Sequence, residues 1–320
     1  MKKSLIFSCL ALAMLASCSN DEELATSQQK EIAFTVAANK ATRAALEGTT
    51  LEDGQKIYIS AYNSVSGNYF KGVEFGKDTD TWKGGKYWPV NGVTSFLAYT
   101  AKSATAEILG TPEWGDKFAN SVTFTIANGF YNAGEQEQKI ETPYADLLYA
   151  NGEQAKEKDY TAVPMTFKHA GAWVVFNIKL GTDLTGASVT VNTFQLAKIF
   201  NSGKFVVDNG SYALKAAWDF SGETAADYDV QSFAAKDLST TAYTFGSIIP
   251  EQAQTAIKFN YTLSGDGFTP QTVNYEYPLS RFDKWEMGKK YVYNITISFK
   301  EIEITPSVTE WEDNNANIAI

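Results

Sequence analysis

Apolar and polar residues alternate in short runs along most of the chain. Side chains of a β-strand point to opposite faces in turn, so this alternation predicts strands that each bury one face. The clearest runs are Glu31–Val36, Val122–Ile126, Ala172–Ile178, Ile257–Leu263 and Tyr291–Phe299. No segment keeps the i, i+3, i+4, i+7 spacing of an amphipathic helix over three turns. The pattern therefore predicts an all-β protein of the sandwich type.

Two stretches between these runs indicate how the strands are organised. Ser264–Gly267 is rich in glycine and separates Ile257–Leu263 from a returning alternation, which predicts a hairpin. Asn151–Asp159 is polar, charged and without periodicity, which predicts an internal boundary. We therefore expect an N-terminal β-sandwich domain over residues 44–155 and a C-terminal one over residues 156–320.

The alternation changes phase near the C-terminus. Apolar residues occupy odd positions up to Phe299 and even positions at Ile302 and Ile304. Because a slip of one residue turns side chains to the opposite face, we expect either a bulge near Lys300 or a new strand with a different partner. The given sequence then ends with Ile318-Ala319-Ile320, in which two isoleucines alternate with an alanine. Frayed termini are usually polar, so this apolar end is expected to dock.

The first residues predict export. Lys2 and Lys3 precede an apolar stretch from Leu5 to Ala16, which is too short to cross about 30 Å of hydrocarbon. Residues 1–17 are therefore predicted to be a signal peptide. The sequence Leu15-Ala16-Ser17-Cys18 resembles a bacterial lipobox, in which the cysteine becomes the new N-terminus and carries acyl chains. We expect lipidation at Cys18, anchoring in the outer membrane, and an acidic tether directly after it.

The charge and the residue composition of the chain argue against several classes of function. The chain has 320 residues, with 27 Lys and Arg against 37 Asp and Glu, and a net charge of −10. This balance argues against a nucleic-acid partner, because neutralising phosphates requires a concentrated cationic surface. The single histidine, His169, and the two cysteines leave no His/Cys zinc cluster and little choice for a catalytic triad. We therefore expect no enzyme activity, no cofactor and no metal site.

A series of short motifs follows in a characteristic order and spacing. They are the Ile32–Phe34 strand, Thr42–Ala44, Gly54–Tyr62, Trp82 with Tyr87–Pro89, Ser95–Tyr99, Asp146–Ala150, Met165–Ala170, Trp285 with Gly288, Tyr291 and Tyr293, Ile304–Pro306, and Val308–Trp311. Together with the lipobox, they give the mature chain a resemblance to the fimbrillins of type V pili. The resemblance implies two tandem transthyretin-like β-sandwich domains and a cell-surface pilus subunit with a role in adhesion.

The resemblance also implies a maturation step. In fimbrillins an Arg-specific protease removes the N-terminal segment with its first strand, and the matching cut here lies between Arg43 and Ala44. Residues 18–43 would then comprise the tether and a removable strand, formed by Ile32, Phe34 and Val36. Arg43 and Arg281 are the only arginines, and Arg281 lies near aromatic residues in the predicted sandwich. We therefore expect Arg43 to be the accessible site.

Polymerisation is the last implication of the resemblance. A C-terminal strand from the next subunit would fill the groove left by the removed strand, so the partners would be pilin subunits of the same family. Two stretches of this sequence qualify as the donor, Ile302 with Ile304 and Ile318 with Ile320.

An alternative function follows from the same N-terminus and the aromatic content. The chain could be a surface lipoprotein that stays monomeric and binds polysaccharide through exposed Trp and Tyr side chains. Aromatics make up 14% of the residues, which leaves enough rings for such a surface.

Overall fold

The fold is built almost entirely from β-strands, as the alternation predicts. The computed structural model describes residues 30–36, 51, 56–101, 112–114, 120–125, 131–132, 139–140, 147–155, 162–184, 186–208, 215–231, 236–265, 268–298 and 302–311. Within these residues the helical structure is a short 3-10 helix, Thr182–Leu184. None of them forms a helix long and apolar enough to cross a lipid bilayer.

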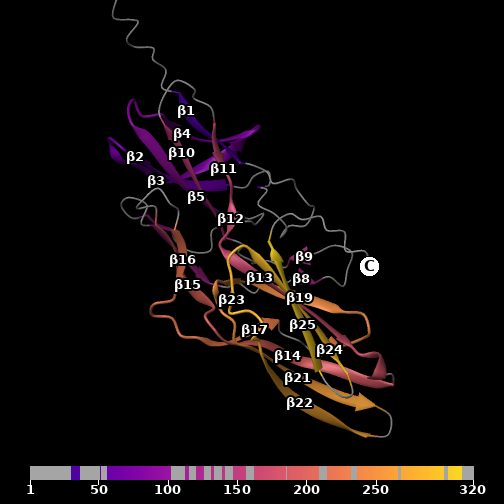
Figure 1. The fold of residues 1–320 in the computed structure, drawn as a ribbon. Helices are drawn as coiled ribbons and strands as arrows, with labels where there is room; N and C mark the ends of the chain where they lie inside the picture. Colours follow the sequence, from indigo (N-terminus) through magenta and orange to yellow (C-terminus); the bar gives the residue numbers. More distant parts are fainter. Residues whose placement is uncertain are drawn as a thin grey trace, which may run out of the picture.

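The N-terminal part forms one eight-stranded sheet, which we call the front sheet (Figure 1). Its spatial order is β11-β1-β4-β3-β2-β5-β10-β12. The strands are β1 (Glu31–Val36), β2 (Lys56–Asn63), β3 (Gly67–Asp78), β4 (Thr81–Tyr87), β5 (Val93–Ala101), β10 (Leu147–Ala155), β11 (Val163–Met165) and β12 (Lys168–His169).

Two further sheets face each other and form the back sandwich. One has the order β19-β13-β24-β25, and the other has the order β17-β14-β21-β22 with β18 paired to β14. The strands are β13 (Gly171–Leu180), β14 (Ala187–Ile199), β17 (Ala226–Gln231), β18 (Lys236–Asp237), β19 (Tyr243–Pro250), β21 (Ala256–Gly265), β22 (Phe268–Pro278), β24 (Lys289–Ile297) and β25 (Ile302–Glu310). The predicted hairpin is confirmed, because β21 and β22 pair antiparallel.

Smaller sheets complete the fold. A four-stranded sheet has the order β16-β15-β7-β6, and two pairs of short strands are β20-β23 and β8-β9. Their bounds are β6 (Pro112–Trp114), β7 (Asn120–Thr125), β8 (Tyr131–Asn132), β9 (Lys139–Ile140), β15 (Ser202–Asp208), β16 (Lys215–Asp219), β20 (Gln252–Ala253) and β23 (Lys284–Trp285).

Strand pairing crosses the expected domain boundary in both directions. Strand β7 precedes that boundary and pairs with β15, while β11 and β12 follow it and join the front sheet. The division into residues 44–155 and 156–320 stays a prediction, and membership in a sheet does not follow it.

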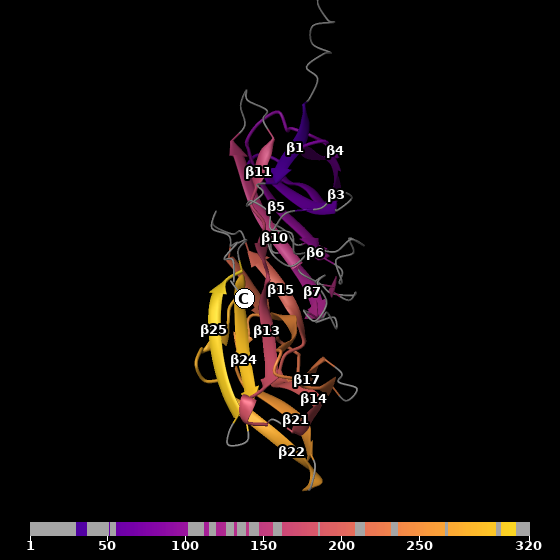
Figure 2. The same ribbon diagram turned by 90° about the vertical axis from the view of Figure 1, so that its right-hand side faces the viewer.

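Two hydrophobic cores lie on opposite faces of the same strands. On β5, Phe96 and Ala98 belong to the core of the front sheet, whereas Leu97 and Tyr99 belong to the core of the back sandwich. Strand β10 alternates in the same way. Its Tyr149 ring lies 5.0 Å from that of Phe205, between centroids, in β15. The two cores therefore share β5 and β10, the strands of the front sheet that are labelled toward the back sandwich in Figure 2.

The phase change near the C-terminus coincides with the passage from one strand to the next. Strand β24 ends at Ile297, and β25 begins at Ile302 and folds back antiparallel on β24, with Ile297 opposite Ile302. Of the two expected explanations, a new strand is the one observed. Its partner is the preceding strand itself rather than a different one.

A glycine in the middle of the back sandwich allows close packing of two strands. Gly246 in β19 lies opposite Val175 in β13, and a Cβ added to it would overlap the carbonyl oxygen of Val174. We expect Gly246→Ala to lower the free energy of unfolding by about 1–3 kcal/mol, measured by chemical denaturation. Gly76→Ala in β3 is the matched control, since nothing lies within 4 Å of its added Cβ. Equal stability of the two variants would contradict the packing argument.

The shared strands also predict sensitivity to alkali. Burial raises the pKa of the Tyr99 hydroxyl, and the nearby Tyr149 raises it further. The folded state therefore holds this proton more tightly than the unfolded chain, whose tyrosines titrate near pH 10. The free energy of unfolding should fall as the pH rises above about 10, and less so in Tyr99→Phe. Urea denaturation between about pH 9 and 11 measures this difference. Parallel pH profiles for parent and variant would place the titration at other groups.

Candidate assembly interface at strands β1 and β25

Strand β1 lies inside the front sheet rather than at its edge. It pairs antiparallel with β4, where Phe34 is opposite Trp82, and parallel with β11, where Phe34 is opposite Val163. The expected removable strand is thus hydrogen-bonded on both sides. Taking it out would leave two strand edges without a partner, one on β4 and one on β11.

The side chains of β1 complete the core of the front sheet. Ile32 and Phe34 are fully buried, and Val36 is half-buried against the same core. The Phe34 ring meets the rings of Phe75 and Phe96 edge-on, with centroid distances of 5.1 and 4.9 Å. Each fully buried large apolar side chain contributes about 1.5–3 kcal/mol, so these two residues are a sizeable part of the core.

The N-terminal end of β1 is fixed by polar contacts. The amide of Gly85 donates a hydrogen bond of 2.9 Å to the Glu31 carboxylate, and the Trp88 amide donates one of 3.0 Å to the Lys30 carbonyl. Gly85 has a φ of +65°, a conformation that favours glycine and suits the irregular pairing of β1 with β4. The Glu31 carboxylate, the backbone hydrogen bonds and the buried side chains of β1 therefore all hold this strand in one register.

Strand β25 is held in a different way. It pairs with β24 over nine residues and, in the described part of the chain, has no strand on its other side. Ile302 and Ile304 are half-buried and pack against the core of the back sandwich, while the second half of the strand is largely exposed. This strand could leave its sheet by breaking a single ladder.

The end of β25 is anchored by a tryptophan. Trp311 is only 3% exposed, and its ring stacks on that of His169 at 3.6 Å between centroids with 9° between the planes. Its amide donates a hydrogen bond of 2.7 Å to the Gly288 carbonyl. Trp173 packs nearby and carries the Lys290 ammonium over its face at 3.8 Å. We call the contact of Trp311 with His169 and Gly288 the clasp.

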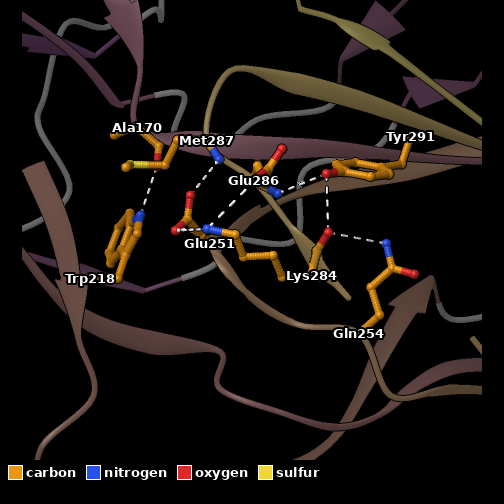
Figure 3. A network of polar contacts seen from close by, with 8 residues as sticks. All are labelled: Ala170, Trp218, Glu251, Gln254, Lys284, Glu286, Met287 and Tyr291. Carbon is orange, nitrogen blue, oxygen red and sulfur yellow. Dashed lines mark hydrogen bonds and ion pairs between the residues drawn. The ribbon is translucent and has the colours of Figure 1, made fainter. Parts of the chain in front are cut away.

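The loop that leads into β24 is fixed by a polar network (Figure 3). Glu251 accepts hydrogen bonds from the Lys284 ammonium at 2.8 Å and from the Met287 amide at 3.1 Å. The contact with Glu251 raises the pKa of Lys284. The Tyr291 hydroxyl donates to the Lys284 carbonyl and accepts from the Glu286 amide, at 3.1 and 3.0 Å. The partner strand of β25 thus starts from a rigid loop.

The structure places the expected residues in two separate groups. Ile32, Phe34 and Val36 lie in the front sheet, and Ile302 and Ile304 lie at an edge of the back sandwich, as Figures 1 and 2 show. Cys18, Arg43, Ala44, Ile318 and Ile320 lie outside the described residues. Within one chain, β1 and β25 belong to different sheets.

The aromatic surroundings of Arg281 do not explain why a protease would prefer Arg43. Arg281 follows strand β22, and although Trp285 nearby is buried, Arg281 itself is exposed. A residue can lie beside aromatic neighbours in sequence while its own side chain points to solvent. Arg281 is therefore open to a protease as well, and cleavage after Arg43 stays a prediction.

The clasp was not anticipated from the sequence. A large aromatic residue directly after a weakly buried strand is the one signal that could have drawn attention to Trp311. Its partner His169 lies 142 residues earlier in the chain, so only the fold brings the two rings together.

Comparison with known proteins gives one family and several related folds. The profile of the fimbrillin-like family matches residues 42–311. No curated protein matches the chain. A fimbrial protein from Bacteroides vulgatus has a similar structure, with 16% identity, a TM-score of 0.56, and 88% of this chain and 99% of that chain covered. A candidate cell adhesion protein from Bacteroides uniformis has 18% identity, a TM-score of 0.52 and the same coverage. At such identities the likeness concerns the fold.

The packing of β1 generates a stability prediction. Phe34→Ala should lower the free energy of unfolding by about 3–5 kcal/mol, because it removes a fully buried ring between Phe75 and Phe96. Thr35→Ala is the control on the same strand, since Thr35 is only half-buried. Chemical denaturation measures both. A small effect of Phe34→Ala would mean that β1 contributes little to the core.

Proposed function

The chain belongs to the fimbrillin-like family, and we propose that it is a structural subunit of a surface pilus, assembled by insertion of a donor strand. The observation that carries the proposal is the position of β1, which fills the front core and is paired on both sides. Loss of such a strand leaves an apolar groove between two unpaired edges. Edges of this kind recruit a strand from another chain.

The free energy gained by burying the apolar side chains of a donor strand is sufficient for a durable filament. A donor strand that replaces Ile32 and Phe34 and buries two further large side chains would gain on the order of 6–12 kcal/mol before ordering costs. The groove lies in the front sheet and the donor in another part of the neighbouring chain, so the contact is heterologous. Heterologous contacts that do not close a ring produce filaments.

Export and maturation complete the proposal. The precursor would be lipidated at Cys18, carried to the outer membrane and displayed on the cell surface. An Arg-specific protease would then cut between Arg43 and Ala44 and release β1. This role is structural rather than catalytic, and its partners are further pilin subunits.

The donor is proposed to come from the C-terminal part, from Ile302 with Ile304 or from Ile318 with Ile320. In both pairs the two isoleucines are two positions apart, which is the spacing of Ile32 and Phe34 and would put them on one face of an inserted strand. Strand β25 supports the first pair, because it is a half-buried edge strand with a single partner among the described strands. The double variants Ile302→Asp/Ile304→Asp and Ile318→Asp/Ile320→Asp separate the two, since only the true donor loses polymer formation.

The alternative of a monomeric polysaccharide binder has less support. Such a surface needs several exposed Trp or Tyr rings as platforms for sugars, and among the described residues Tyr69 and Tyr87 are exposed. The described indole rings give little such surface, because Trp218 is half-buried and the others are buried, namely Trp82, Trp88, Trp173, Trp285 and Trp311.

Proteolysis tests the proposed function directly. Protein lacking residues 1–17 and carrying Arg281→Lys, treated with an Arg-specific protease, should be cut after Arg43 and then form ladders on a denaturing gel. Arg43→Ala in the same background should remain uncut and monomeric. Cleaved protein that stays monomeric at high concentration would contradict donor-strand assembly, and binding on a glycan array would then favour the alternative.

A further inference from the structure

A single short segment contacts both strands of the proposed assembly interface. We call Val163–His169, which comprises β11, two connecting residues and β12, the coupling segment. Its first half pairs with β1, and its last residue stacks on Trp311 at the end of β25. Only four positions separate Met165, opposite Val36 of β1, from His169.

The first half of the coupling segment depends on β1. In the described part of the chain, β1 is the only strand with which β11 pairs. Val163 and Met165 are fully buried, lie beside it in the same sheet and pack against Gly152 of β10. A Cβ added to Gly152 would lie 2.9 Å from Val163 and 3.1 Å from the Met165 sulfur. Without β1, this half would lose its whole hydrogen-bond ladder and one wall of its side-chain packing.

The second half of the coupling segment holds the clasp. His169 pairs with Leu148 of β10 and presents its ring to Trp311. Just beyond it, the Gly171 carbonyl accepts a hydrogen bond of 2.9 Å from the Gly288 amide, and the Gly288 carbonyl accepts one from the Trp311 amide. Gly288 has a φ of +69°, which lets its amide and carbonyl serve both neighbours. The end of β25 is thus fastened to residues that follow directly from β11.

We propose that the coupling segment makes release of β25 depend on loss of β1. While β1 is in place, β11 is ordered, His169 is held under Trp311, and β25 stays on its own sheet. When β1 leaves, β11 loses its partner, the clasp loosens, and the half-buried β25 can detach. This inference rests on the proposed function, because the coupling is useful only in donor-strand assembly. It would ensure that a subunit offers its strand only after its own groove has opened. It also keeps the precursor from exposing strand edges early.

Hydrogen exchange on the full chain tests the coupling. Phe34→Asp places a charge in the front core and should expel β1 without cutting the chain. The amides of β25, and those of β24 that bond to it, should then exchange at least about tenfold faster than in the parent, whereas β21 and β22 should keep their protection. Phe70→Ala is the matched control, because it removes a ring from the same core without touching the pairing of β1.

A second variant tests the clasp alone. Trp311→Ala should speed exchange in β25 to a similar extent while β1 stays protected. If Trp311→Ala opens β25 but Phe34→Asp does not, the clasp is not coupled to β1 and the inference is overturned. It is equally overturned if Phe70→Ala opens β25 as much as Phe34→Asp does. If Phe34→Asp loses protection in every strand, Ile32→Ala replaces it, because it weakens the packing of β1 less severely. Faster exchange in β25 would then support the coupling, and unchanged exchange in β25 would overturn it.

The readout separates this inference from the proposed function. Exchange is measured on the monomer, at a concentration too low for association. Coupled opening without gel ladders after cleavage at Arg43 would contradict the pilus proposal alone. Ladders without coupled opening would contradict the coupling alone.

Discussion

The packing of β1 into the front sheet is the interaction on which the rest of the assembly argument depends. Phe34 lies between Phe75 and Phe96, and its backbone lies between β4 and β11. A strand paired on both sides and buried on one face is costly to remove spontaneously, because two ladders and the core contacts are lost together. The same arrangement makes the vacated position specific, since any replacement must supply two ladders and apolar side chains at alternate positions.

The second constraint is that the two cores share strands. Because β5 and β10 bury one face in each core, their backbones are packed between the two sets of side chains. The coupling segment adds a covalent connection along the same direction, from β11 through β12 to β13. Strand β25 is attached to this connection through the stacking of Trp311 on His169, which is the contact on which the proposed coupling depends.

Local pattern was sufficient to predict much of the fold. The alternation at Ala172–Ile178 and Tyr291–Phe299 predicts β13 and β24, and the glycine-rich turn predicts the β21–β22 hairpin. The same pattern could not predict that β7 pairs with β15, nor that β11 joins the front sheet, because these partners are far apart in sequence. For a related reason the sequence did not show that Arg281 is exposed, since aromatic neighbours in sequence do not fix which way one side chain points.

The sequence by itself determined the all-β class, the candidate export signal, and the alternating residues Ile32, Phe34, Ile302 and Ile304 as the apolar faces of two strands. These features depend on residues a few positions apart, which periodicity and composition record. Only the tertiary structure decided that β1 is an interior strand, that β25 is an edge strand, and that His169 lies under Trp311. The two pairings of β1 join Phe34 to residues 48 and 129 positions away, and His169 lies 142 positions before Trp311. No local pattern encodes which distant strand will be the neighbour.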